Sequence, residues 1–261
     1  MRNFLRFYFK TVSFSVAQMT VYRTSFWLYY LWLLGDTAIK VLFFGAIFTQ
    51  VDSIGGWTFT NTFLLVLFNG LLWDFAWTFF LTGFEDFIEN FSKGNFDFIL
   101  LKPMNPLLYL TISGFAARSF SGARLPLLIY AIFFLSIQWQ FSSSIAALVI
   151  FVAGIMIFHA IFAIVAALSF WIIDPEPILD LAFGITEGSR YPITIFPQAM
   201  RFIFTFIIPI FFVANFPVMV IQNLIGQREA VLTALFVAIC SQIVAYLVWK
   251  VSVRHYSSAS S

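Results

Sequence analysis

The sequence contains very little cysteine and very little charge. Cys240 is the only cysteine among 261 residues, which excludes a disulfide within the chain and a cysteine-based metal cluster. Charged residues make up 10% of the chain and hydrophobic residues 61%, whereas an ordinary soluble domain is about 25% charged and about 45–50% apolar. A water-soluble fold of this size could not cover so many apolar side chains. We therefore expect a multi-pass membrane protein, in keeping with a mean hydropathy of +0.94.

Sequence signatures of catalysis are also missing. The chain has no H-E-x-x-H, no G-x-S-x-G and no cysteine–histidine pair, and it has no G-x-x-x-x-G-K-[ST] loop to hold nucleotide phosphates. We accordingly predict no catalytic residue, no metal site and no cofactor bound by this chain. A cleavable signal peptide is not expected, because basic residues spread through the first segment and no small-residue cleavage site follows a short apolar core.

Long apolar runs dominate the rest of the sequence. A helix of about 20 apolar residues crosses about 30 Å of hydrocarbon. On this measure the sequence predicts an all-α polytopic membrane fold, with one transmembrane domain over 26–261. The six expected spans are 26–48, 62–84, 122–140, 144–173, 199–216 and 230–251. Pro209 and Pro217 interrupt the fifth run.

The first 25 residues have a different pattern. Arg2, Arg6 and Lys10 recur at i, i+4 and share one helical face, while aromatic residues fall on the other side. This pattern predicts an interfacial amphipathic helix over 1–25 that lies on the membrane surface. The alternative is an ordinary positive flank before the first span.

The basic residues are distributed unevenly between the two sides. With both termini in the cytoplasm, 12 of the 14 Lys and Arg fall in inner loops and ends, Arg228 lies outside and Lys40 lies within a span. The 12 are Arg2, Arg6, Lys10, Arg23, Lys93, Lys102, Arg118, Arg124, Arg190, Arg201, Lys250 and Arg254. This asymmetry predicts cytoplasmic termini and an even number of spans.

A polar region at 84–106 interrupts the apolar runs on the predicted cytoplasmic side. Within it, FEDFIENFSK indicates a short amphipathic helix with Glu85 and Glu89 on one face. Gly94 and Pro103 prevent a continuous helix from passing through the region. Three of the four charges in the helix are acidic, and anionic lipids of the inner leaflet would repel them. A protein partner is therefore favoured over a lipid surface.

Two motifs resemble those of a family of membrane subunits of bacterial ABC-type exporters, the small six-span permeases of the second class without a fused ATPase. The first motif, G-x-x-D-x-x-L-x-K/R-P, is matched by Gly94, Asp97, Leu100, Lys102 and Pro103. The second surrounds the fifth run and is matched by Tyr191, Pro192, Pro197, Arg201, Thr205, Phe206, Pro209 and Pro217. The resemblance covers essentially the whole chain in order and spacing.

The resemblance implies the permease subunit of an ATP-driven exporter in the bacterial inner (plasma) membrane. The region 84–106 would hold a coupling helix that docks on a cytoplasmic ATP-binding subunit, and 215–229 would form an outer re-entrant segment. Two permease subunits, identical or related, would work with two ATP-binding subunits that carry ATP and Mg; no nucleic acid is expected as a partner. The expected coupling residues are Phe84, Glu85, Asp86, Glu89, Lys93, Gly94 and Asp97.

Polar residues inside the predicted spans form a further group. A charge at mid-bilayer costs about 2.5–3.5 kcal/mol on insertion scales, so such residues usually pair or line water. Counted at about 1.5 Å per residue, Asp36, Lys40 and Asp74 lie within one or two turns of the same depth. We predict that they form a buried cluster, which serves either packing and charge neutralisation or substrate passage. His159 has no second intramembrane histidine beside it, which favours a hydrogen-bonded packing role over a proton relay.

Two other functions stay open on the sequence alone. One is an ion-gradient-driven secondary transporter in which Asp36 and Asp74 bind the ion, although no convincing inverted repeat relates the two halves. The other is a non-transporting membrane scaffold. For a transporter, aromatic walls with few charges favour an amphiphilic, lipid-like or hydrophobic cationic cargo.

Overall fold

The computed structural model describes residues 2–91, 93–94, 96–119, 122, 124–134, 140–172 and 174–256, with the backbone alone for 2–6, 118 and 132–134. These residues form helices, with one isolated bridge between Ile54 and Trp57 and no strand among the described ranges. The longer helices are α1 (Arg2–Val21), α2 (Arg23–Phe48), α3 (Phe59–Ala76), α4 (Thr82–Phe91), α7 (Arg124–Phe134), α8 (Phe141–Leu168), α9 (Glu176–Thr186), α11 (Phe211–Ile221) and α12 (Gln227–Arg254). The shorter ones are α5 (Phe96–Leu100), α6 (Pro106–Ser113) and α10 (Gln198–Phe202), and 3₁₀ turns occur at Ala117–Ser119, Glu187–Arg190 and Ile193–Ile195.

In the described part of the chain, four helices are long and apolar enough to cross a membrane: α2, the helix Phe59–Phe91, α8 and α12. A fifth candidate is the pair Gln198–Ile207 and Phe211–Ile221, which is bent by 106°. The chain is thus an all-α polytopic membrane protein. The predicted third span, 122–140, lies partly outside the described residues, and its described helical part is the 11-residue α7.

The helix Phe59–Phe91 runs through the predicted second span and on into the predicted coupling region. α3 and α4 are joined by a π-helical turn, Trp77–Leu81. A π turn adds a residue to the helix without ending it. The amphipathic helix expected in the region 84–106 is therefore not a separate element, and α4 continues directly from the membrane-spanning α3.

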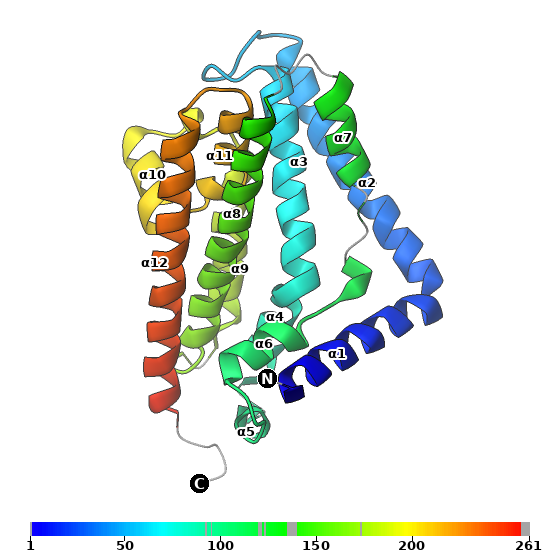
Figure 1. Cartoon of the computed structure of the whole chain (residues 1–261), viewed down its shortest axis with the longest axis vertical. Coiled ribbons are helices and arrows are strands. Elements are labelled where there is room, and N and C mark those ends of the chain that lie inside the picture. The colour runs from blue at the N-terminus through cyan, green and yellow to red at the C-terminus, as the bar shows by residue number, and fades with distance from the viewer. Residues whose placement is uncertain are drawn as a thin grey trace.

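α8 lies at the centre of the bundle, between α12 and α3 in Figure 1, and packs against both α12 and α11. Gly154 lies on the side of α8 that faces α11, where an added Cβ would lie 2.8 Å from Val213 Cα and 3.0 Å from Phe212 O. Helices in a bilayer pack closely where small residues let the backbones approach. Gly154 is required for this approach.

Alanine at Gly154 is expected to destabilise the bundle by about 1–3 kcal/mol, the usual cost of overpacking. Gly35→Ala is the matched control, because Gly35 also lies in a membrane helix but has nothing within 4 Å of the added Cβ. Thermal unfolding of the two purified variants in detergent measures the difference. Equal melting temperatures would show that α8 and α11 are not packed as described.

The segment 174–195 crosses the bundle from one end to the other. Four contacts mark its course in chain order: Phe183 with Trp77, Ser189 with Asn69, Tyr191 with Phe44, and Thr194 with Gly55. Asn69 lies nearer than Trp77 to the start of the helix Phe59–Phe91, Phe44 lies near the end of α2, and Gly55 lies in the loop between α2 and α3. This crossing is made by α9 and the two 3₁₀ turns after it, a stretch that the sequence predicted to be a loop, whereas the predicted fifth span, 199–216, falls within the bent pair 198–221.

The bent pair 198–221 is a hairpin at the end of the molecule that holds Gly55. It follows Thr194, reaches the middle of α8 where Phe212 lies beside Gly154, and returns to the start of α8, where Ser143 contacts Asn223. The bend lies at Ile208–Ile210, next to Pro209, whereas Pro217 lies inside α11. The prediction that Pro217 breaks the chain is wrong, because a membrane helix tolerates proline where neighbouring groups satisfy its backbone. The bend of 106° gives the pair 198–221 the geometry of either a broken span or a re-entrant loop, and the predicted re-entrant segment 215–229 begins within its second helix.

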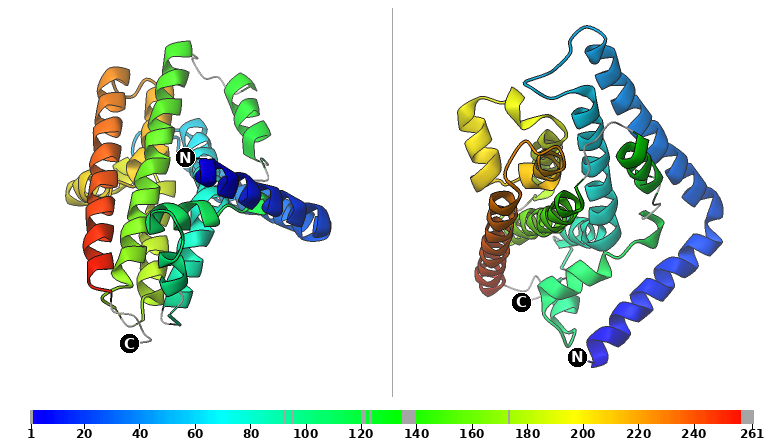
Figure 2. Two further views of the ribbon diagram at one scale, coloured as in Figure 1. Left: turned by 60° about the horizontal axis from the view of Figure 1, so that its bottom comes forward. Right: turned by 45° about the horizontal axis from the view of Figure 1, so that its top comes forward.

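α1 and α2 stand apart from this bundle. α1 meets α2 at a sharp angle, and together they form an open V beside α3, with α7 between α2 and α3 (Figure 2). α2 is thinly covered, and its buried residues are Leu33, Thr37 and Phe44. The V leaves space beside α3, and the charged residues predicted to lie within the membrane occur there.

Candidate functional site

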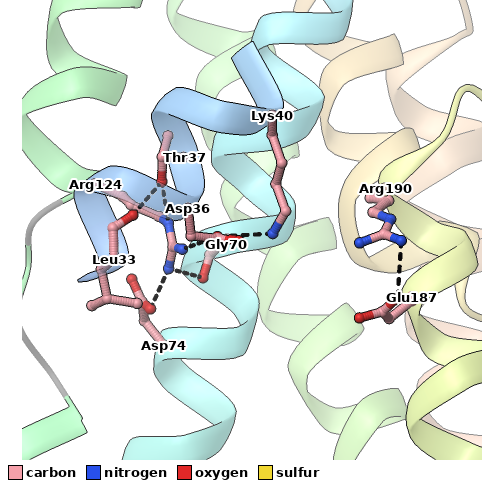
Figure 3. Close-up of polar contacts among 9 residues, drawn as sticks. All are labelled: Leu33, Asp36, Thr37, Lys40, Gly70, Asp74, Arg124, Glu187 and Arg190. Atoms are coloured by element: carbon pink, nitrogen blue, oxygen red, sulfur yellow. Dashed lines mark hydrogen bonds and ion pairs between the residues drawn. The ribbon is translucent and has the colours of Figure 1, made fainter. Parts of the chain in front are cut away.

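Arg124, the first residue of α7, is the centre of a buried charge cluster (Figure 3). Its side chain is 4% exposed and donates to Asp36 Oδ2 at 2.9 Å and to Asp74 Oδ1. It also donates to Thr37 Oγ1 at 2.9 Å and to Gly70 O at 3.1 Å. Both carboxylates are therefore bridged by one guanidinium, whose planar fork of donors suits several acceptors at once.

The predicted trio of Asp36, Lys40 and Asp74 does form a cluster, but Arg124, which was not part of the prediction, joins its members. Lys40 Nζ lies 2.8 Å from Asp36 Oδ2, one helical turn away, and the link to Asp74 is made by Arg124. Arg124 was predicted in an inner loop, and that placement is wrong. A signal was available, because two acids and one lysine leave the trio with a charge of −1, and burial at low dielectric favours a neutral sum.

Glycine at position 70 makes room for the guanidinium. A Cβ there would lie 2.4 Å from Arg124 Nε and 2.5 Å from its Cδ. The side chain of Arg124 thus lies flat against the backbone of α3. This close approach lets it reach Asp74, one turn further along the same helix.

A cavity of about 890 Å³ lies beside the cluster, in the space between α2 and the helix Phe59–Phe91. It reaches from Lys40 and Gly70 to Gln18 and Glu85. Gly70 and Glu85 are 15 residues apart, which corresponds to about 22 Å along a helix. Aromatic side chains form much of the wall, among them Tyr29, Trp32, Trp73 and Trp77.

The far wall of the cavity comes from α9 and the 3₁₀ turn after it. Glu187 and Arg190 line it and form an ion pair of 2.9 Å (Figure 3). The guanidinium of Arg190 also lies over the ring of Tyr191, 5.2 Å from its centroid. Arg190 was predicted in an inner loop; the structure places it instead within the crossing segment 174–195.

A buried polar network supports the irregular backbone next to this wall. Asn215, which is fully buried in α11, accepts from Ile193 N at 2.8 Å and donates to Ser189 O at 3.0 Å. Asn69 of α3 donates to Ser189 Oγ at 2.7 Å. Non-helical backbone at membrane depth is tolerated only where such partners satisfy it. Sequence reasoning assigned no site role to Asn69 or Ser189.

Arg201 of the second motif lies at the same end of the molecule as Gly55. Arg201 donates to Phe196 O at 2.7 Å and Thr194 O at 2.8 Å, and so fixes the turn that leads into α10. Arg201 was predicted at the inner end, together with the region 84–106. The structure places it at the opposite end, because Thr194, to which it is hydrogen-bonded, contacts the loop before α3. Tyr191 and Pro192 connect the two 3₁₀ turns of the crossing segment.

His159 ties three elements together in the membrane. Its Nε2 lies 2.9 Å from Thr111 Oγ1 of α6, and its Nδ1 lies 3.2 Å from Gln242 Nε2 of α12. The rings of Phe80 and Phe84 pack against it. Both ring nitrogens have neutral partners, so these are the contacts of a packing histidine.

The seven predicted coupling residues lie in different environments, and three of them are exposed. Phe84 is 0% exposed and packs in the core, so it cannot contact a partner. Glu85 lines the cavity, while Asp97 accepts from Tyr256 Oη at 3.0 Å. Gly94 has φ 75°, a conformation natural to glycine, and turns the chain after α4. Asp86, Glu89 and Lys93 remain exposed.

Apolar residues extend this exposed surface beyond the predicted set. Phe98 is 66% exposed and Leu101 81%, and Lys102 and Pro103 of the first motif are also exposed. We call the residues Asp86, Glu89, Lys93, Phe98, Leu100, Leu101, Lys102 and Pro103 the 86–103 surface. The sequence predicted Leu100 only as a motif residue and did not predict Phe98 or Leu101, because their apolar character resembled that of a span.

An aromatic cluster lies behind the 86–103 surface. The cluster comprises Phe87, Phe91, Phe96, Phe170, Trp249 and Tyr256, with ring centroids 4.8–6.5 Å apart in the contacting pairs. Its members come from α4, α5 and the ends of α8 and α12. Aromatic pairs in such geometry contribute beyond their area burial. The surface is therefore joined firmly to three membrane helices.

A family model described as "ABC-2 family transporter protein" matches residues 34–260. Searches of curated proteins and of solved structures gave no match. The matched range includes every charged residue of the cavity, the 86–103 surface and both sequence motifs. On this evidence the chain belongs to the ABC-2 family of transporter proteins, and it is a permease component of an ABC transporter.

Proposed function

We propose that the chain forms the translocation path of an ATP-driven exporter in the bacterial inner membrane. A separate cytoplasmic ATP-binding subunit, carrying ATP and Mg, docks on the 86–103 surface. Two copies of that subunit act with two permease subunits, identical or related. Phe84, Gly94 and Asp97 support this surface from behind or at its turns rather than contacting the partner.

The observation that carries the proposal is the continuity of the helix Phe59–Phe91. One end of this helix bears Asp86 and Glu89 of the 86–103 surface, and its middle bears Asp74 and Gly70 of the charge cluster. Movement of a docked partner would therefore reach the cavity wall through a single element. Alternating access requires such a mechanical link between the nucleotide subunit and the path.

The distribution of basic residues supports cytoplasmic termini in spite of the corrected positions. Of the 12 basic residues predicted inside, Arg124 and Arg190 lie within the bundle and Arg201 lies at the opposite end, which leaves 9. Arg201 and Arg228 occupy the other end. A ratio of 9 to 2 still favours the end with the 86–103 surface as the cytoplasmic one.

Aspartate at Leu101 is expected to abolish co-purification with the ATP-binding subunit. Truncating or charging a central apolar contact in an interface costs about 2 kcal/mol or more, and Leu101 is the most exposed large apolar residue of the surface. His255→Asp is the control, because His255 is exposed near the same end but caps the C-terminus of α12, outside the 86–103 surface. The measurement is a detergent pull-down with quantification of every bound subunit.

Each alternative function predicts a different outcome of these experiments. A secondary transporter would continue to transport when the ATP-binding subunit is catalytically dead, and a scaffold would not transport at all. If wild-type protein captures no ATP-binding subunit, and crosslinkers placed at Glu89 also capture none, the proposal fails.

A further inference from the structure

Among the side chains that the structure describes, the charges that line the cavity do not sum to zero. Seven of these charged side chains line it: Asp36, Asp74, Glu85, Glu187, Lys40, Arg124 and Arg190. Four negative and three positive charges give −1. Six of the seven are paired with one another, since Arg124 and Lys40 neutralise the two aspartates and Arg190 neutralises Glu187. Within the described residues Glu85 has no ion pair, and it is the source of the excess.

Glu85 is placed where a ligand can meet it. It lies at one end of the cavity, on α4, and its residue is half-buried rather than free in solvent. A carboxylate in this position attracts cations into the cavity, because a cavity with low-dielectric walls concentrates the field of its charges. The three basic residues of the wall do not oppose this effect, because each already has a carboxylate partner.

The aromatic walls match the same chemistry. Trp77 lies between Asp74 and Glu85 on the helix Phe59–Phe91, and Trp73 and Trp32 also line the cavity. The face of an indole ring carries negative charge density and attracts a cation, and the same ring covers apolar groups. Such a wall suits a ligand that combines a positive charge with apolar bulk.

We propose that this cavity binds a compact lipophilic organic cation, with its positive charge beside Glu85 and its apolar groups against the indoles of Trp73 and Trp77. The inference deepens the proposed function, because this cation would be the class of cargo that the permease moves. The cavity volume of about 890 Å³ lies within the range of about 300–1,000 Å³ that is typical for small-molecule pockets. This size favours a compact ion over the whole of a two-chain cationic lipid, although the two share their head-group chemistry.

A pair of probes of one shape and opposite charge tests the proposal. Tetraphenylphosphonium and tetraphenylborate are measured by equilibrium binding to the purified chain in lipid nanodiscs, with empty nanodiscs subtracted. We expect the phosphonium to bind at least tenfold more tightly than the borate. Glu85→Gln is expected to weaken phosphonium binding by about tenfold, a size typical of the loss of one desolvated charge contact.

Glu176→Gln is the matched control. Glu176 lies in the first turn of α9, is exposed and does not line the cavity, so its replacement is expected to leave phosphonium binding unchanged. Equal binding of both probes, or unchanged binding by Glu85→Gln, overturns the proposal. Binding of a two-chain cationic lipid to the chain, with no binding of the phosphonium, would assign the site to a lipid and would also overturn the proposal.

This assay contains no ATP-binding subunit, so its result does not depend on the proposed docking. Loss of co-purification with intact phosphonium binding would overturn only the exporter assignment. Co-purification without phosphonium binding would overturn only the cargo class. Melting temperatures of the two glutamine variants, expected to equal that of the wild type, show that any change in binding is not due to unfolding.

Discussion

Replacing Arg124 with methionine is expected to destabilise the protein by about 3–5 kcal/mol, the usual cost of removing one partner from a buried ion pair. The cluster then holds Asp36, Asp74 and Lys40, with a sum of −1, and the carboxylate of Asp74 loses its ion-pair partner. Thermal unfolding in detergent and the yield of folded protein from membranes measure the effect. A melting temperature equal to that of the wild type would contradict the cluster described here.

Two further variants separate charge from packing at this site. Lys40→Met also leaves a sum of −1, but Lys40 is 28% exposed and has one carboxylate partner, so its effect is expected to be clearly smaller. Arg124→Met combined with Asp74→Asn restores a neutral sum and is expected to recover more than half of the lost stability. If the double variant is no better than the single one, the role of Arg124 lies in its hydrogen bonds to Thr37 and Gly70 rather than in its charge.

Leucine at Asn215 is expected to cost about 2–6 kcal/mol. The change leaves the N–H of Ile193 and the carbonyl of Ser189 without their partners, and each orphaned buried group costs about 1–3 kcal/mol. Thermal unfolding measures the loss of stability. Protease accessibility of the segment 187–197 shows whether the loss is local to the turns that Asn215 holds.

Asn69→Leu provides the graded comparison for Asn215. It removes one hydrogen bond to Ser189 Oγ, and that hydroxyl keeps its bond to Thr186 O at 2.7 Å. Its cost is expected to be about 1 kcal/mol. If Asn69→Leu lost more stability than Asn215→Leu, the backbone of 187–193 would be held by something other than Asn215.

Hydropathy and charge predicted the broad fold because they report directly on the membrane. Three apolar runs, at 26–48, 144–173 and 230–251, correspond to α2, α8 and α12 with small shifts at their ends. The intramembrane Asp36, Lys40 and Asp74 also revealed a common site, because burial of charge is costly wherever it occurs. These inferences need no knowledge of which helices are neighbours.

The errors arise where tertiary contacts override composition. The segment 174–195 contains four acids together with prolines and glycines, so its hydropathy is that of a loop. It crosses the bundle because Asn215 and Asn69 satisfy its backbone and Arg190 pairs with Glu187. The hairpin 198–221 is more apolar and resembled a span. A single sequence does not show either set of partners.

Arg124 was misplaced for a related reason. A basic residue just before an apolar run resembles the flank of a loop, and the positive-inside rule then predicts that it lies in a cytoplasmic loop. Its actual partners come from α2 and α3, 50 to 88 positions away in the chain. The charge imbalance of the predicted trio was the one indication that a further cation belonged there.

The length of the helix Phe59–Phe91 sets a relation between this protein and the thickness of its bilayer. Its 33 residues extend about 50 Å, whereas the hydrocarbon of a typical bilayer is about 30 Å thick. The helix is therefore roughly 20 Å longer than the hydrocarbon layer is thick. Either the whole helix tilts, or the excess length lies in the head-group region and the water beyond it. The acyl-chain length of the surrounding lipids consequently helps to set how far Asp86 and Glu89 stand from the membrane.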